Sequence, residues 1–154
     1  IRRGYELPCF EEAVAGLNCH NIPWIVHVIL GLPGETKEVV YETITYINRF
    51  QPFGIKLQLL HVLEGTDLAT DYKQGKFTTL TKEEYLEMLI HSLEILSPEI
   101  IIHRLTGDGP KDLLLAPMWS RNKKDVLNTL HREMSLRDTY QGRLFHATGS
   151  IDTL

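Results

Sequence analysis

The chain has 154 residues, 43% of them hydrophobic, and a formal net charge of −4 at pH 7. This length suits one globular domain with a sizeable core, and the acidic balance gives no long-range attraction for nucleic-acid phosphates. No apolar run approaches the roughly 18 residues that a membrane span needs, and the first residues lack the order of a secretory signal. We therefore expect a cytoplasmic protein with no membrane partner.

Cys9 and Cys19 are the only cysteines. On a helix they would lie about 80° apart, which suits neither a disulfide nor a metal pair. We expect both to be small thiols, buried or half-buried, in a reducing compartment.

The first predicted elements are a helix over 8–20, a strand over 24–30 and a helix from Glu35 to about Phe50. The first helix has apolar residues at spacings of three and four, from Phe10 to Leu17. The strand is a nearly unbroken apolar, β-branched run, which predicts a parallel strand covered on both faces.

A second strand is predicted over 55–62, because its residues begin by alternating. Ile55, Leu57 and Leu59 share one face, which we expect to meet helices, whereas Lys56 and Gln58 share a polar face. A short helix over 67–74 and a longer helix from Thr81 to before Pro98 follow, the latter opening with a capping-box pattern. A third strand is predicted over 99–105 and a terminal helix over 125–134.

This order predicts an α/β fold of parallel βαβ units with right-handed crossovers. Three strands are few for such a sheet, so the chain is interpreted as part of a larger open or closed barrel. Residues 1–142 form the predicted domain, and the polar, aperiodic residues 143–154 are a predicted disordered tail.

Glycine and polar residues follow each predicted strand, in the segments 31–36, 61–66 and 103–110. Functional residues of parallel β/α folds gather at these carboxyl ends. Gly31 and Gly34 would let the backbone approach a carboxylate or a nucleoside, although a turn can require glycine for its geometry alone. Neither a phosphate loop nor a dinucleotide fingerprint is present.

The segment 28–36 (VILGLPGET) resembles the fifth-strand motif of radical S-adenosylmethionine (SAM) enzymes, particularly the group of the Elongator catalytic subunit, the methylthiotransferases and oxygen-independent coproporphyrinogen oxidase. The segment 59–68 similarly resembles the sixth-strand segment, which ends in Gly-Thr-x-Leu. The segments 103–110 and 115–120 resemble those of an uncharacterised bacterial subfamily. The resemblance runs from Arg2 to about Gly142.

The resemblance implies the C-terminal half of a partial (β/α)6 TIM-like barrel. It also implies two cofactors, S-adenosylmethionine and a [4Fe-4S] cluster, the cluster being bound by a Cys-x3-Cys-x2-Cys motif outside this chain. The intact protein would be an oxidoreductase-like, metal-binding enzyme that generates a 5′-deoxyadenosyl radical and acts on an unknown substrate. The fragment alone is expected to be inactive.

The resemblance also implies site residues. Those expected to contact SAM are Ile29, Gly31, Leu32, Pro33, Gly34, Glu35, Leu60, His61 and Val62, the last three through their backbone. Those expected to contact substrate are His27, Lys56, Gln58, His103, Arg104 and Asp108. Each substrate assignment has a structural alternative. His27 could be a core histidine whose hydrogen bonds are made within the protein, and Lys56 and Gln58 could lie on an exposed sheet face. Asp108 could belong to a turn in which its side chain bonds its own backbone. A zinc site made of the three strand histidines is disfavoured, because they lie on different strands.

The alternative function is a non-catalytic α/β module that binds RNA or a protein through scattered basic residues, among them Arg121 and Arg137. The substrate stays open, with RNA as one candidate. We also expect the fragment to self-associate as a dimer, because half a barrel leaves the 24–30 strand near an uncovered edge.

Overall fold

A computed structural model describes residues 4, 6–107 and 109–146 of the chain. Its elements are α1 (Leu7–Cys19), β1 (Ile25–Leu30), α2 (Lys37–Asn48), β2 (Gly54–Leu59), β3 (Val62–Leu63), α3 (Asp67–Lys73), α4 (Lys82–Ile95), β4 (Ile101–Arg104), β5 (Leu114–Ala116), the 3-10 helix η1 (Met118–Arg121) and α5 (Lys123–Leu136). Within these described ranges no helix has the length and apolar character to cross a bilayer.

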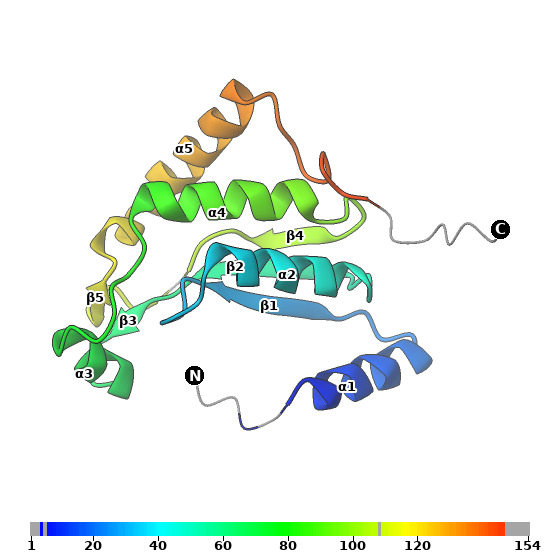
Figure 1. Ribbon diagram of the computed structural model, residues 1–154, viewed down its shortest axis with the longest axis horizontal. Coiled ribbons are helices and arrows are strands. Elements are labelled where there is room, and N and C mark those ends of the chain that lie inside the picture. Colours follow the sequence, from blue (N-terminus) through cyan, green and yellow to red (C-terminus); the bar gives the residue numbers. More distant parts are fainter. Residues whose placement is uncertain (1–3, 5, 108, 147–154) are drawn as a thin grey trace.

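Three strands form one parallel sheet in the order β1-β2-β4. β1 pairs with β2 in continuous register along all six residues of each strand. β4 pairs with the other side of β2, and the register shifts between Ile55 and Lys56. In Figure 1, α4 runs beside this sheet and α5 lies on the far side of α4. The predicted α/β fold, with three parallel strands and flanking helices, is confirmed.

One face of the sheet carries the core. Its buried strand residues alternate along the chain and are Val28, Leu30, Ile55, Leu57 and Leu59. They belong to one cluster with buried residues of α2 and α4, among them Val40, Ile44, Tyr85, Leu89 and Leu93. The other face is polar: His27 is exposed, and Lys56 and Gln58 are half-buried. The predicted division of the second strand is therefore confirmed, but the expectation that the first strand is covered on both faces is wrong.

The second strand is shorter than predicted. β2 ends at Leu59, and the N–H of Leu60 still donates to the carbonyl of Leu30 at 2.9 Å. Val62 then starts β3, which pairs antiparallel with β5. The alternation within 55–62 carries no information about β5, a partner from much later in the sequence. His61 consequently lies between the two sheets and belongs to neither ladder.

α1 covers less of the molecule than its apolar stripe suggested. Val14 is its one buried residue among those described. Phe10 makes the aromatic contacts, with ring centroids 6.0 Å from Trp24 and 5.6 Å from Phe50. Cys9 and Cys19 are both exposed, so the expectation of buried or half-buried thiols is wrong. The helix buries too narrow a stripe to include them.

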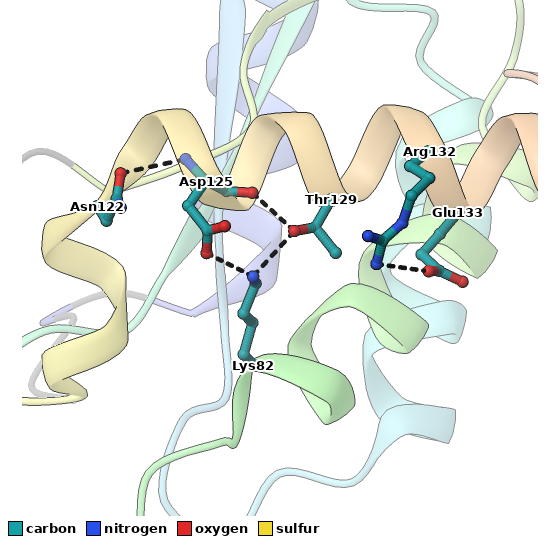
Figure 2. A network of polar contacts seen from close by, with 6 residues as sticks. All are labelled: Lys82, Asn122, Asp125, Thr129, Arg132 and Glu133. Atoms are coloured by element: carbon teal, nitrogen blue, oxygen red, sulfur yellow. Dashed lines mark hydrogen bonds and ion pairs between the residues drawn. The ribbon is translucent and has the colours of Figure 1, made fainter.

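α4 and α5 are joined through a small polar network (Figure 2). Lys82 Nζ lies 2.5 Å from Asp125 Oδ2 and 2.9 Å from Thr129 Oγ1. Thr129 Oγ1 in turn donates to the backbone carbonyl of Asp125. Lys82 follows Thr81, the N-cap of α4, whose capping box with Glu84 was predicted and is confirmed. The network fixes the start of α5 against the start of α4.

The predicted tail 143–154 falls largely outside the described residues. Within the described part, the N–H of Leu144 donates to the carbonyl of Glu94 at 2.8 Å. Residues 147–154 lie outside the described part of the chain. The division at residue 142 stays a prediction.

Candidate functional site

A cavity of about 230 Å³ opens at the carboxyl ends of the parallel strands. It is lined by Ile29, Gln58, Leu59, Leu60, His61, Arg104, Gly107 and Gly109. Each of β1, β2 and β4 contributes lining residues at its end, as expected for parallel β/α folds. The structure thus brings together five of the residues proposed from the sequence, three of them assigned to SAM and two to substrate.

His61 is packed against the backbone of the loop that follows β4. A Cβ atom placed on Gly107 would lie 2.5 Å from His61 Cε1, and one on Gly109 would lie 2.8 Å from His61 Nδ1. Any larger residue at either position would have to displace the imidazole. These glycines therefore allow the loop to form one wall of the cavity. Asp108, predicted to contact substrate, lies outside the described residues.

The turn after β1 does not line this cavity, and its two glycines differ. Gly31 has φ +85°, and a Cβ there would meet Leu80 Cδ1 at 2.8 Å. Gly34 has φ +78°, and a Cβ there would meet nothing within 4 Å. Gly31 therefore serves both turn geometry and packing, whereas only Gly34 has open space on its side-chain side.

Glu35 acts within the same turn. Its carboxylate accepts a hydrogen bond from the N–H of Leu32 at 3.3 Å, and its own N–H donates to the carbonyl of Leu32 at 3.0 Å. Partial burial raises the pKa of Glu35, while hydrogen bonds from the backbone of Leu32 and Gly31 act in the opposite direction. Pro33 is exposed. The predicted contact between this turn and SAM would therefore be made by the exposed residues of the turn and by its backbone.

The backbone of residues 60–62 was predicted to pair with the adenine edge. The N–H of Leu60 already donates to Leu30, and Val62 is paired with Ala116 across β3 and β5. Leu60 and His61 both line the cavity, and neither the N–H of His61 nor its carbonyl belongs to the β1–β2 or the β3–β5 pairing.

The polar sheet face joins four of the predicted substrate residues. His27 is in register with Lys56, and Lys56 with Arg104. Arg104 Nη1 donates to Gln58 Oε1 at 3.5 Å, and Gln58 Nε2 lies 3.5 Å from His27 Nδ1. The pKa of His27 is lowered, first by burial and then by the charges of Lys56 and Arg104.

His103 lies away from this group. A Cβ on Gly54 would lie 2.4 Å from His103 Cδ2, and the ring centroid of Phe53 is 5.9 Å from that of His103. Gly54 is the first residue of β2, so His103 lies at the opposite end of the strand from the cavity. The register shift in β2–β4 separates it from Arg104.

Sequence reasoning did not find a second, larger cavity of about 530 Å³. It is lined by Tyr72, Thr79, Leu80, Thr81, Lys82, Glu83, Leu115, Ala116, Pro117, Met118 and Trp119. Trp119 Nε1 donates to the carbonyl of Leu80 at 3.0 Å and fixes one wall. In the sequence, the segment 115–120 indicates only a family resemblance. No local pattern predicts that it packs beside residues 79–83, so the cavity between them could not be predicted.

The sequence disfavours a zinc site and offers scattered basic residues for a phosphate backbone. Among the described residues no group of three or more His, Cys, Asp or Glu side chains is arranged to hold a metal ion. Arg137, one of the basic residues of the alternative binding module, is in an ion pair with Glu87, and Arg132 of α5 pairs with Glu133. These pairs reduce the positive charge that α5 offers to a phosphate backbone.

Comparison with known proteins gives one family and several relatives. A model of the Radical_SAM C-terminal domain matches residues 52–135. The chain is 40% identical over 145 residues to the uncharacterised protein YtqA of Bacillus subtilis, covering 94% of this chain and 45% of that protein. It is 30% identical over 146 residues to an uncharacterised protein of Methanocaldococcus jannaschii, covering 94% of this chain and 45% of that protein.

Two more distant matches are one by sequence and one by fold. A tRNA uridine(34) acetyltransferase of Methanocaldococcus infernus is 22% identical over 139 residues, covering 88% of this chain and 26% of the relative. A solved structure of Elp3 from the same archaeon, with an N-terminal deletion, superposes with a TM-score of 0.74 at 19% identity. That match covers 91% of this chain and 33% of the other. The chain therefore spans less than half the length of these proteins.

Proposed function

The chain belongs to the Radical_SAM C-terminal domain family, and from this premise we propose that it forms SAM-binding strand ends of a radical SAM enzyme. The family match and the Elp3-like fold support the radical SAM lineage. Because the chain spans only 45% of YtqA, the activity is proposed for the intact protein. The fragment alone is proposed to be inactive.

The observation that carries the proposal is the cavity at the strand ends. Ile29, Leu60 and His61, three residues that the family resemblance assigns to SAM, come from two strand ends and line one space. Ligands of parallel α/β folds bind outside the carboxyl ends of strands. The family resemblance of these residues and their position at the strand ends both support the proposal.

The lining residues fit part of a nucleoside-containing cofactor. Ile29 and Leu60 offer apolar contact for a purine ring, and Gln58 offers an amide for hydrogen bonds. The volume of about 230 Å³ is below the roughly 300–1,000 Å³ of common ligand pockets. Such a partial cavity suits a site that residues outside this chain complete.

In the intact protein, SAM and a [4Fe-4S] cluster bound by residues outside this chain would supply the reductive cleavage that yields a 5′-deoxyadenosyl radical. The described residues would bind and orient SAM. His61, held by Gly107 and Gly109, would fix the position of the nucleoside end.

The test uses the full-length protein, purified without oxygen and reconstituted with iron and sulfide. With a reductant and SAM it should release 5′-deoxyadenosine, whereas the 154-residue chain treated identically should bind no stoichiometric iron and release none. A fully loaded, reduced protein that leaves SAM intact would contradict the proposed activity. Stoichiometric iron on the short chain would contradict the assignment of the cluster to residues outside it.

A further inference from the structure

We propose that the polar face of the main sheet binds an anionic group of the substrate, a phosphate or a carboxylate, between Lys56 and Arg104. This proposal rests on the proposed function, because it concerns the substrate that would bind beside SAM inside the same barrel.

The first observation is the alignment of three basic residues across three strands. His27, Lys56 and Arg104 occupy matching register positions on β1, β2 and β4. Neighbouring strands lie about 4.8 Å apart, so adjacent side chains in this row can reach one phosphate or carboxylate together. We call these three residues the basic row.

The second observation is that the charge of the basic row is not neutralised within the described structure. Lys73, Lys76 and Lys82 each pair with a carboxylate at 2.5 or 2.6 Å. In the described part of the chain, Lys56 and Arg104 form no such ion pair. The whole chain has 20 acidic and 16 basic residues, so two basic side chains that form no ion pair with any described residue run against the overall composition.

Like charges opposite one another on a sheet destabilise it, and half-burial strengthens their repulsion. Arg104 Nη1 donates to the neutral Gln58 Oε1 at 3.5 Å, a contact that brings no negative charge to Arg104. The lowered pKa of His27 is a further sign of this positive potential, although burial is its larger cause. A bound anion would remove the repulsion and use the donors of both side chains.

The third observation is the position of the row relative to the cavity. Gln58 and Arg104 line the cavity, whereas His27 and Lys56 do not. Lys56 precedes Gln58 by two residues, so the row extends roughly 7 Å deeper along the strands. SAM at the strand ends and a substrate anion at the basic row would therefore lie next to each other. A radical formed from SAM needs this proximity to reach its substrate.

The test is an NMR titration of His27 in the full-length protein with inorganic phosphate or acetate, at constant ionic strength kept with chloride. An anion at the basic row should raise the measured pKa of His27 saturably, by about 0.5 or more. In Lys56→Gln and Arg104→Gln the starting pKa should be higher and should no longer respond. Lys124→Gln, which removes an exposed charge on α5, should respond like the wild type.

The two probes distinguish the kind of anion: a response to phosphate alone supports a phosphate group on the substrate, a response to acetate alone supports a carboxylate, and a response to both supports an anion site that accepts either. No response to either probe, or an equal response in all variants, overturns the proposal.

SAM also carries a carboxylate, so SAM affinity is measured in the full-length protein. Lys56→Gln should bind SAM as the wild type does, and a loss of tenfold or more would assign the row to the cofactor and overturn the substrate assignment. A wild-type protein that binds no SAM contradicts the proposed function, while the phosphate titration still decides the anion site.

Discussion

The two glycines after β1 look alike in the sequence and differ in the structure. Both have positive φ, a conformation that costs an L-residue roughly 1–2 kcal/mol. At Gly31 the missing side chain makes room for Leu80, whereas at Gly34 the space is open. A ligand can therefore approach at Gly34, and the sequence alone could not separate the two, because Leu80 comes from a distant loop.

Gly31→Ala should lower the free energy of unfolding by more than Gly34→Ala. Both variants carry the cost of positive φ, and Gly31→Ala adds overpacking of about 1–3 kcal/mol against Leu80. Urea denaturation of the two variants measures the difference. In a Leu80→Ala background the difference should shrink. Equal losses in the wild-type background would contradict the packing role given to Gly31.

The residue-level predictions from the sequence succeeded where a side chain's face follows from alternation. Lys56 and Gln58 lie opposite the core face, as the alternation of β2 predicts. His103 and Arg104 could not be separated in this way, because a register shift between β2 and β4 changes the relation between neighbouring residues. Such a shift depends on the partner strand and leaves no signal in one segment.

At the scale of elements, the helices and parallel strands were predictable because their periodicity is local. The capping box at Thr81 marked the start of α4, and the apolar alternation marked β2. The pairing of β3 with β5 was not predictable, because it joins segments far apart in sequence. The same pairing ends β2 early and places His61 at the cavity.

The contact between α4 and α5 gives a prediction at this scale. Asp125→Asn should lower the free energy of unfolding by about 1 kcal/mol, because the Lys82 side chain, only 20% exposed, loses its ionic partner. Arg132→Gln is the control, since Arg132 is 67% exposed and its pair with Glu133 (Figure 2) should contribute less than about 0.5 kcal/mol. Thermal and urea denaturation measure both. A larger loss for Arg132→Gln than for Asp125→Asn would contradict this account.

At the scale of the whole molecule, the described chain is half of a barrel with an open interior face. β1 and β4 are the edges of a three-stranded sheet, and Ile25, Phe53 and Ile101 are 36%, 50% and 49% exposed. Exposed edges and apolar surface favour pairing with another chain.

We therefore predict that the isolated chain forms a dimer, because a closed two-fold contact is the commonest way for identical chains to bury one surface. Light scattering over a concentration series should give about twice the mass of one chain at the high end. A mass that stays at one chain throughout would show that α1 and the terminal helix suffice to close the fragment.

The central claim is that the strand-end cavity binds SAM, and a matched pair of variants tests it. Ile29 and Ile25 lie on the same face of β1, but only Ile29 lines the cavity. In the full-length protein, purified without oxygen, Ile29→Trp should fill the cavity and weaken SAM binding at least tenfold, or about 1.4 kcal/mol, in an equilibrium titration. Ile25→Trp should bind SAM as the wild type does. Equal SAM affinity in a folded Ile29→Trp protein would contradict the assignment of this cavity.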